Sequence, residues 1–142
     1  MPIREMKESD LPQVLAIQRE LSFQDWNEKQ FLAEIRASYA LCMVYEADII
    51  EGYAVFHLMG PDSELLSIAT KASAQRKGIG SELLQAGLDR LDFTAGDKMF
   101  LEVREKNSKA RRFYEKHDFT AYGNRSRYYS DGENAILYSK TK

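Results

Sequence analysis

Apolar residues in the first part of the chain recur at helical spacing. A first helix is predicted from one apolar face made of Leu11, Val14, Leu15 and Leu21. Ser9 or Asp10 can cap its start, and Pro12 is tolerated in its first turn. A second helix is predicted from an apolar face made of Phe31, Leu32 and Ile35.

Runs rich in β-branched and aromatic residues follow, and they have the length of strands. Residues 39–46 and 49–60 predict a hairpin around the polar turn at 46–48, and residues 64–70 form the next strand after the turn Gly60-Pro61-Asp62. Further strands are predicted at 98–104, 120–129 and 135–140, with helices at about 81–91 and 107–119. Hairpins at both ends and strand–helix alternation between them predict a mixed-sheet α/β or α+β domain.

Composition narrows the class of protein. The 142 residues carry a net charge of −2, so no basic field draws in nucleic acid. This length predicts one domain spanning residues 1–142. No apolar run reaches the roughly 18 residues of a membrane span, the first residues do not resemble a signal peptide, and Cys42 is the single cysteine. We therefore expect a cytoplasmic protein with neither a membrane nor a direct nucleic-acid partner.

Two glycines stand one residue apart in SAQRKGIGSELL, residues 73–84. A dinucleotide fingerprint would need a third glycine where Leu83 stands, and the GxxxxGK phosphate loop occurs nowhere in the sequence. Arg76 and Lys77 precede Gly78 and Gly80 at the start of a predicted helix. Glycines allow close backbone approach, and the first helical amides are donors at the positive end of the helix. The segment fits either a pyrophosphate site or a glycine-rich turn with a solvated basic pair.

The order of strand, glycine segment and amphipathic helix resembles the GNAT acetyltransferase superfamily. Gln75, Gly78 and Gly80 match its pyrophosphate motif, and LEVREKNSKARRFYEKHDF, residues 101–119, is similar to the strand and helix that follow. The resemblance implies the GNAT fold, an α/β (α+β) fold with a mixed, mostly antiparallel central sheet and helices on both faces. It also implies acetyl-CoA as co-substrate, bound through Ile68, Ala69, Thr70, Arg76, Lys77, Gly78, Ile79, Gly80, Ser81 and Asn107.

Three segments narrow the resemblance to N-terminal acetyltransferases. FQDWNEKQF, residues 23–31, and SRYYSDGENAILY, residues 126–138, are similar to segments of that group, the second to its YY-x-DGEDA pattern. LEVR carries Glu102 ahead of Tyr114. Together they resemble the RimI family of ribosomal-protein-alanine N-acetyltransferases. That resemblance implies acetylation of the N-terminal alanine of a small-subunit ribosomal protein, with acceptor contacts from Trp26, Tyr128 and Tyr129.

The sequence departs from the family pattern at a few positions. Asp118 stands where the family usually has glycine at the end of a helix. Aspartate visits the left-handed region at modest cost, so we expect the helix to end there nonetheless. Asn134 replaces the usual Asp of the tyrosine segment, and LYSK replaces a more apolar last strand. The last two departures affect the acceptor side of the site.

Two side chains fit the chemistry of amine acetylation. An α-amine with a pKa near 7.7–8.0 must mostly lose a proton before it attacks, which suits a carboxylate acting directly or through water. Glu102 interrupts the apolar run MFLEV. It is either the general base, as the resemblance implies, or a strand-end glutamate paired with Arg104 or another base. Tyr114 is either the proton donor to the leaving thiol, again by resemblance, or an amphipathic core tyrosine.

Other positions leave alternatives open. Tyr128 and Tyr129 belong either to a loop over the acceptor or to an exposed strand face, and Trp26 is also typical of a core residue. His57 and His117 lack the spacing of a metal site, and Cys42 in an apolar strand is typical of packing, so we expect no metal and direct transfer in a ternary complex. The alternative functions are a small-amine or lysine side-chain acetyltransferase and a non-catalytic acyl-CoA-binding module.

Overall fold

A computed structural model describes residues 2–22 and 26–142. The chain forms two compact units. The N-terminal unit comprises Met1–Met59 and Leu65–Arg90, and the C-terminal unit comprises Gly60–Glu64 and Leu91–Lys142. Strand β4 (Asp62–Thr70) begins in the C-terminal unit and ends in the N-terminal unit. The single domain expected over residues 1–142 stays a prediction.

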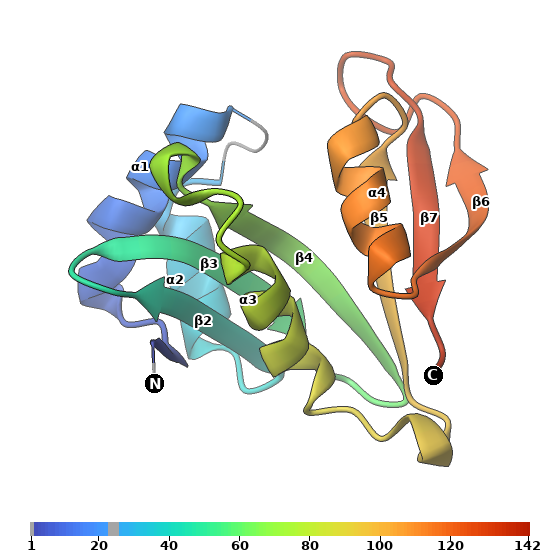
Figure 1. The fold of residues 1–142 in the computed structure, drawn as a ribbon, viewed down its shortest axis with the longest axis horizontal. Helices are drawn as coiled ribbons and strands as arrows, with labels where there is room; N and C mark the ends of the chain where they lie inside the picture. The colour runs from blue at the N-terminus through green and yellow to red at the C-terminus, as the bar shows by residue number, and fades with distance from the viewer. Residues whose placement is uncertain (1, 23–25) are drawn as a thin grey trace. The chain divides into compact units, whose positions relative to one another are not determined.

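The helices and strands follow the order expected from the sequence (Figure 1). Besides the end of β4, the N-terminal unit holds β1 (Ile3–Glu5), α1 (Leu11–Leu21), α2 (Glu28–Arg36), β2 (Ala40–Glu46), β3 (Ile50–His57) and α3 (Ile79–Leu88). The C-terminal unit adds β5 (Lys98–Arg104), α4 (Ser108–Lys116), β6 (Thr120–Arg125) and β7 (Ala135–Lys140). Short 3-10 helices lie at Glu8–Asp10, Ala72–Ala74 and Phe93–Ala95.

Over the described residues the strands form one seven-stranded sheet in the order β1-β2-β3-β4-β5-β7-β6. The pairs β1–β2, β2–β3, β5–β7 and β6–β7 are antiparallel. Strands β4 and β5 pair in parallel, with Asp62 opposite Lys98 and Glu64 opposite Phe100. The prediction of a mixed, mostly antiparallel sheet is therefore confirmed.

Strand β3 is central to the N-terminal unit because both of its faces are buried. Tyr53 and Val55 lie in a core with residues of α1 and α2. On the other face Phe56 contacts α3, where a Cβ added to Gly87 would come within 2.3 Å of the Phe56 ring. Glycine at this position lets α3 lie close against the strand. Helices thus cover both faces of this part of the sheet, as expected (Figure 1).

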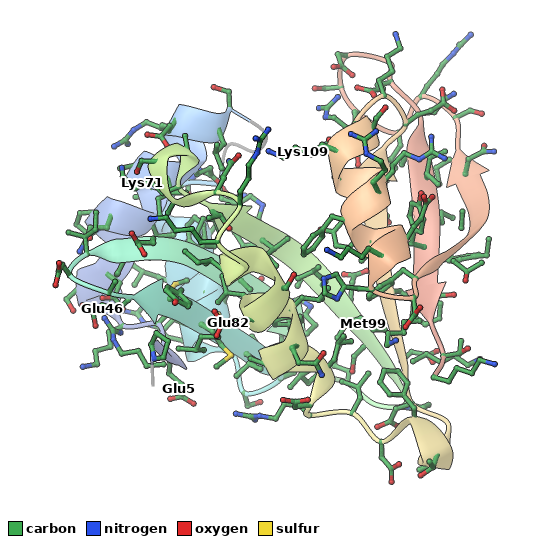
Figure 2. All side chains as sticks on the ribbon, viewed as in Figure 1. Glu5, Glu46, Lys71, Glu82, Met99 and Lys109 are labelled. Atoms are coloured by element: carbon green, nitrogen blue, oxygen red, sulfur yellow. The ribbon has the colours of Figure 1, made fainter. Side chains whose placement is uncertain are left out.

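The C-terminal unit packs α4 against β5 and β7 (Figure 1). The fully buried Tyr138 of β7 donates a hydrogen bond to Glu115 of α4 at 2.7 Å and accepts one from Arg111 Nε at 3.1 Å. Tyr138 lies opposite Leu101 of β5, so Leu101 shares the face that α4 covers. Met99, labelled in Figure 2, is fully buried on this same face. The alternate residues of β5, which include Glu102, face the other way.

Several boundaries differ from those expected, and one strand was not predicted. The helix expected at 81–91 begins earlier, at Ile79, because Gly78 takes a left-handed conformation as its N-cap. The strand expected at 120–129 ends at Arg125, and Arg127 beyond it has a φ of 52° that no strand accommodates. Strand β1 was not predicted, since three residues are too few to show an alternating pattern.

A charged cluster ties β1 to the start of α1. Arg4 donates to both carboxylate oxygens of Asp10, at 2.8 and 2.9 Å, and its Nε donates to Glu46 at 2.8 Å. Glu46, labelled in Figure 2, is the last residue of β2. Asp10 also accepts the Lys7 amide at 2.7 Å, and its side chain is only 7% exposed. The hydrogen bonds from Arg4 hold the pKa of Asp10 below its ordinary value.

We expect Asp10→Asn to lower the free energy of unfolding at pH 7 by about 1–3 kcal/mol, because Arg4 loses its carboxylate partner. The pKa of Asp10 is lower in the folded than in the unfolded protein. Its stabilisation is therefore present above the unfolded-state pKa, about 3.9, and is lost as the pH falls through the folded-state value. The difference between the two proteins should shrink below about pH 4. Urea unfolding of both proteins between pH 2.5 and pH 7 measures this difference in the free energy of unfolding.

The control for this experiment is Glu8→Gln, which removes an exposed carboxylate 3.6 Å from Arg36. An exposed pair of this kind contributes at most about 0.5–1 kcal/mol to the free energy of unfolding. We therefore expect Glu8→Gln to change the dependence of that free energy on pH only slightly. A loss in Asp10→Asn that is as large at pH 2.5 as at pH 7 would contradict the assignment of the pH dependence to Asp10.

Candidate active site

The glycine segment runs from the loop after β4 into the first turn of α3, and residues 75–81 are called the glycine loop. Arg76 and Gly78 both have left-handed backbone, with φ of 67° and 81°. The Gly78 carbonyl accepts the Glu82 amide at 3.0 Å as α3 begins. A Cβ added to Gly78 would meet nothing within 4 Å, so its conformation rather than lack of space favours glycine. The first amides of α3 have no acceptor within the helix, and this positive end suits an anion.

Gln75 ties the glycine loop back to the end of β4. Its Nε2 donates to the Thr70 carbonyl at 3.2 Å. Residues 68–70 form the last part of β4, with Ala69 buried and Ile68 and Thr70 half-buried. Within the N-terminal unit, the cofactor residues expected at 68–70 and 76–81 therefore lie at the end of β4, in the loop after it and in the first turn of α3.

Trp26 lies in the packing between α1 and α2. Its half-buried ring lies 5.0 Å from the Phe31 ring, measured between centroids. Gln18 Nε2 donates to the Trp26 carbonyl at 2.7 Å, and Gln18 Oε1 accepts the Trp26 amide at 3.2 Å. The contacts of Trp26 are those of a core residue, and its role in binding the acceptor stays a prediction. Phe23, at the start of the same sequence segment, lies outside the described residues.

Glu102 is half-buried on β5, on the face away from α4. The Tyr128 hydroxyl donates a hydrogen bond to its carboxylate. The pairing of Glu102 with Arg104 that the sequence left open is wrong, because Arg104 Nη1 instead donates to Asp131 at 2.9 Å and to Glu133 at 3.0 Å. The carboxylate is thus bonded by a hydroxyl of the tyrosine loop rather than by an arginine of its own strand.

Tyr128 and Tyr129 lie in the loop between β6 and β7, the tyrosine loop (residues 126–134). The strand-face alternative is wrong, since β6 ends at Arg125 and both tyrosines lie in a loop. That this loop lies over the acceptor stays a prediction. The two tyrosine rings meet edge to face at 5.1 Å, and the Arg125 guanidinium lies 5.4 Å from the Tyr128 ring centroid. Tyr128 is 46% exposed, so its ring is accessible beside Glu102.

The electrostatics around the tyrosine loop keep both phenols protonated. The hydrogen bond to Glu102 raises the pKa of Tyr128, with smaller effects from burial and from the charge of Glu102. Burial raises the pKa of Tyr129, and the Glu102 charge acts in the same direction. Both hydroxyls are therefore hydrogen-bond donors over the range in which an amine changes its protonation state.

Tyr114 is buried on α4, with its ring 5.8 Å from Phe119 and 6.5 Å from Tyr138. Burial raises the pKa of Tyr114 well above its ordinary value of 10, and the nearby Tyr129 adds to this effect. The packing of its ring is that of a core tyrosine, and the proton that it retains is also what a donor to the leaving thiol needs. The role of Tyr114 as proton donor stays a prediction.

Asn107 caps the helix that carries Tyr114. Its Oδ1 accepts the Ala110 amide at 3.1 Å and so satisfies a donor at the helix start. At the other end Asp118 has a φ of 68°, and the Phe119 amide bonds the Tyr114 carbonyl at 3.0 Å. The left-handed helix end expected at Asp118 is confirmed.

The sequence did not single out the acidic pair that holds Arg104. Asp131 and Glu133 flank Gly132 in the tyrosine loop, and two acids two residues apart in a glycine turn are the signal that could have revealed them. Among residues 2–22 and 26–142, the structure shows no group of three or more metal-ligating side chains and no helix with the length and apolar content of a membrane span.

Comparison with known proteins adds independent information. Residues 3–119 match the model of the acetyltransferase (GNAT) family. The ribosomal protein bS18-alanine N-acetyltransferase of Escherichia coli is 28% identical over 138 residues, which cover 95% of this chain and 93% of that protein. An uncharacterized N-acetyltransferase of Methanocaldococcus jannaschii is 32% identical over 148 residues, covering 100% of this chain and 92% of that protein.

Two further matches agree with these. An N-alpha-acetyltransferase of Sulfurisphaera tokodaii is 29% identical over 149 residues, covering 95% of this chain and 89% of that protein. The crystal structure of the Escherichia coli ribosomal-protein-S18-alanine N-acetyltransferase superimposes with a TM-score of 0.84, covering 96% of this chain and 90% of that one. The fold expected from the sequence is therefore confirmed.

Proposed function

Because the chain belongs to the acetyltransferase (GNAT) family and is an acetyl-CoA-dependent N-acetyltransferase, we propose that it acetylates the N-terminal α-amine of a protein. The proposed substrate is the N-terminal alanine of a small-subunit ribosomal protein, which would make the cytoplasm the place of the reaction. The observation that carries this proposal is the Glu102 carboxylate on β5 with the Tyr128 hydroxyl bonded to it. The likeness to the bS18-alanine enzyme over nearly the whole chain supports the choice of substrate.

The glycine loop is the proposed site for the pyrophosphate of acetyl-CoA. The left-handed Arg76 and Gly78 and the first turn of α3 offer backbone amides, and Lys77 adds an exposed positive charge. Backbone groups of residues 68–70 are proposed to bind the acyl end of the arm, where an amide polarises the thioester carbonyl. Asn107 uses Oδ1 for its helix cap, so its Nδ2 is the atom proposed to reach the pantetheine arm.

Glu102 is the proposed general base. An α-amine with a pKa of about 7.7–8.0 is mostly protonated at neutral pH, and a carboxylate attracts that ammonium group and accepts its proton directly or through water. The hydrogen bond from Tyr128 orients the carboxylate. The exposed ring of Tyr128 and its neighbour Tyr129 are proposed to contact the first residues of the acceptor, with Trp26 as a further acceptor contact.

Tyr114 is the proposed hydrogen-bond and proton donor to the leaving thiol. Its raised pKa keeps the proton on the phenol until negative charge develops on sulfur. Direct transfer in a ternary complex is favoured over a cysteine acyl-enzyme. Burial raises the pKa of Cys42, the single cysteine of the chain, to about 12, so it is a poor nucleophile at neutral pH.

Gly78→Ala should weaken acetyl-CoA binding by about tenfold or more, because an alanine at φ 81° costs about 1–2 kcal/mol and shifts the loop amides. Gly96→Ala is the matched control: Gly96 also has a left-handed φ, 97°, with nothing within 4 Å of an added Cβ, and it lies in the turn before β5. Calorimetric titration should find acetyl-CoA affinity unchanged in Gly96→Ala. Equal affinity losses in the two variants would exclude the glycine loop as the pyrophosphate site.

Glu102→Gln should lower kcat by about 10²–10⁴-fold while acetyl-CoA affinity stays the same, because glutamine keeps the shape but cannot accept the proton. Steady-state kinetics of peptide acetylation and titration of acetyl-CoA measure the two effects. Glu105→Gln, an exposed glutamate in the turn after β5, is the control and should behave as the original protein. Full turnover in Glu102→Gln would remove Glu102 as the base.

Mass spectrometry with a peptide panel tests the acceptor. Peptides beginning with Ala, Ser and Met, a peptide with a blocked N-terminus and an internal Lys, and small polyamines are each incubated with the protein and acetyl-CoA. We expect acetylation at the N-terminal nitrogen, fastest for the ribosomal alanine sequence. Modification confined to lysine side chains or small amines would refute the proposed substrate while leaving the family assignment intact.

A further inference from the structure

The tyrosine loop is fastened to β5 through one guanidinium group. Arg104 Nη1 donates to Asp131 at 2.9 Å and to Glu133 at 3.0 Å, and Arg104 Cζ lies 4.1 Å from the centroid of the Tyr129 ring. Two carboxylates and an aromatic face thus surround a single cation that is one-third exposed. The three groups come from three positions of the tyrosine loop, so Arg104 fixes the loop at several points at once.

The loop backbone transmits this fastening to Tyr128. Glu133 Oε2 accepts the Lys106 amide at 2.9 Å, and the Glu133 carbonyl accepts the Tyr129 amide at 3.2 Å. The turn between them closes with the Gly132 amide on the Tyr129 carbonyl at 2.9 Å, with Gly132 at a φ of 88°. Tyr128 is the residue immediately before this closed turn. Its position is therefore set by the turn that Arg104 holds.

Arg104 and Glu102 share one face of one strand. They are two residues apart on β5 and pair with Ala135 and Leu137 of β7. Successive residues on one strand face are about 6.6–6.8 Å apart. A loop fastened to Arg104 is therefore held at a fixed distance from Glu102 by the paired strands β5 and β7. Arg104 thus holds the loop that carries Tyr128, and the Tyr128 hydroxyl bonds Glu102 on the same strand as Arg104.

We propose that Arg104 is a positioning residue, which fixes the tyrosine loop over β5 so that the Tyr128 hydroxyl stays on the Glu102 carboxylate. The acid–glycine–acid sequence of residues 131–133 is then the clamp for this arginine. Arginine suits the task because its planar group can bond two carboxylates and stack on a ring, whereas the lysine ammonium offers no stacking plane. For catalysis, this inference rests on the proposed role of Glu102 as the base that receives the acceptor amine.

The kinetic experiment compares Arg104→Gln with the original protein. We expect the peptide KM to rise by about tenfold and kcat to fall less, with acetyl-CoA affinity unchanged within about twofold. In a Tyr128→Phe background, Arg104→Gln should add less than about twofold, because both changes remove the same interaction. Independent, additive effects in the double variant would overturn the proposal. Arg90→Gln, an exposed arginine after α3, is the control for charge removal and should change neither constant.

A spectroscopic experiment tests the same inference without any turnover. Tyrosine labelled with ¹³C at Cζ reports the titration of Tyr128, whose surroundings include the charges of Glu102, Arg125 and Glu64. Removing a nearby positive charge alone would raise the pKa of Tyr128, whereas releasing its hydroxyl from Glu102 would lower it. We expect Arg104→Gln to lower it. A rise or no change would overturn the proposal.

The two experiments separate the inference from the proposed function. If no peptide is acetylated but Tyr128 titrates lower in Arg104→Gln, the acceptor assignment fails and the positioning role stands. Arg104→Lys should restore the titration only in part, because lysine keeps the charge but not the stacking. Thermal unfolding checks that each variant is folded. If Arg104→Gln is not folded, Asp131→Asn weakens the same clamp from the loop side and should shift Tyr128 in the same direction.

Discussion

The positive charge of Arg104, held between two carboxylates and covered by a tyrosine ring, is the interaction on which the acceptor side of the C-terminal unit depends. An irregular loop has few ways to become rigid, since it lacks a ladder of backbone hydrogen bonds. Here a strand residue supplies the anchor, and the glutamate proposed as the base lies on the same strand face. The side chain of Arg104 thus adds a connection between the sheet and the loop to the backbone bond from the Glu105 amide to the Asn134 carbonyl.

Most of the fold could be predicted from the sequence because its elements carry strong local patterns. The strand at 98–104 has the predicted bounds, and the hairpin of β2 and β3 follows from two apolar runs around a polar turn. The errors arose where local pattern is weak. Arg127 alternates with tyrosines as strand residues do, yet its left-handed φ ends the strand, and that conformation depends on the bond from its amide to Asn134 at 2.9 Å. Such a contact is not visible in spacing.

Less of the candidate site than of the fold could be predicted from residue types alone. The glycine loop has a local motif, so its helix start and its left-handed glycine follow from residue types alone. Roles for Glu102 and Tyr114 came from resemblance, since a charge in a strand and a tyrosine in a helix each have ordinary structural explanations. The partner of Glu102 lies 26 positions along the sequence, in the loop that leads into β7, the strand paired with β5. Sequence spacing could not reveal it.

The bond between Tyr128 and Glu102 also has a consequence for which amines the protein accepts. The Tyr128 hydroxyl, tethered beside the Glu102 carboxylate, competes with an incoming amine for that carboxylate. Because the competitor is part of the same chain, its effective concentration does not depend on the protein concentration. An amine that approaches Glu102 must displace it or share the carboxylate with it. Free amines with no further contacts bring little binding energy to that exchange, whereas a polypeptide end can add contacts along the tyrosine loop. With Glu102 as the proposed base, the tethered Tyr128 hydroxyl predicts selectivity for chain ends over small amines.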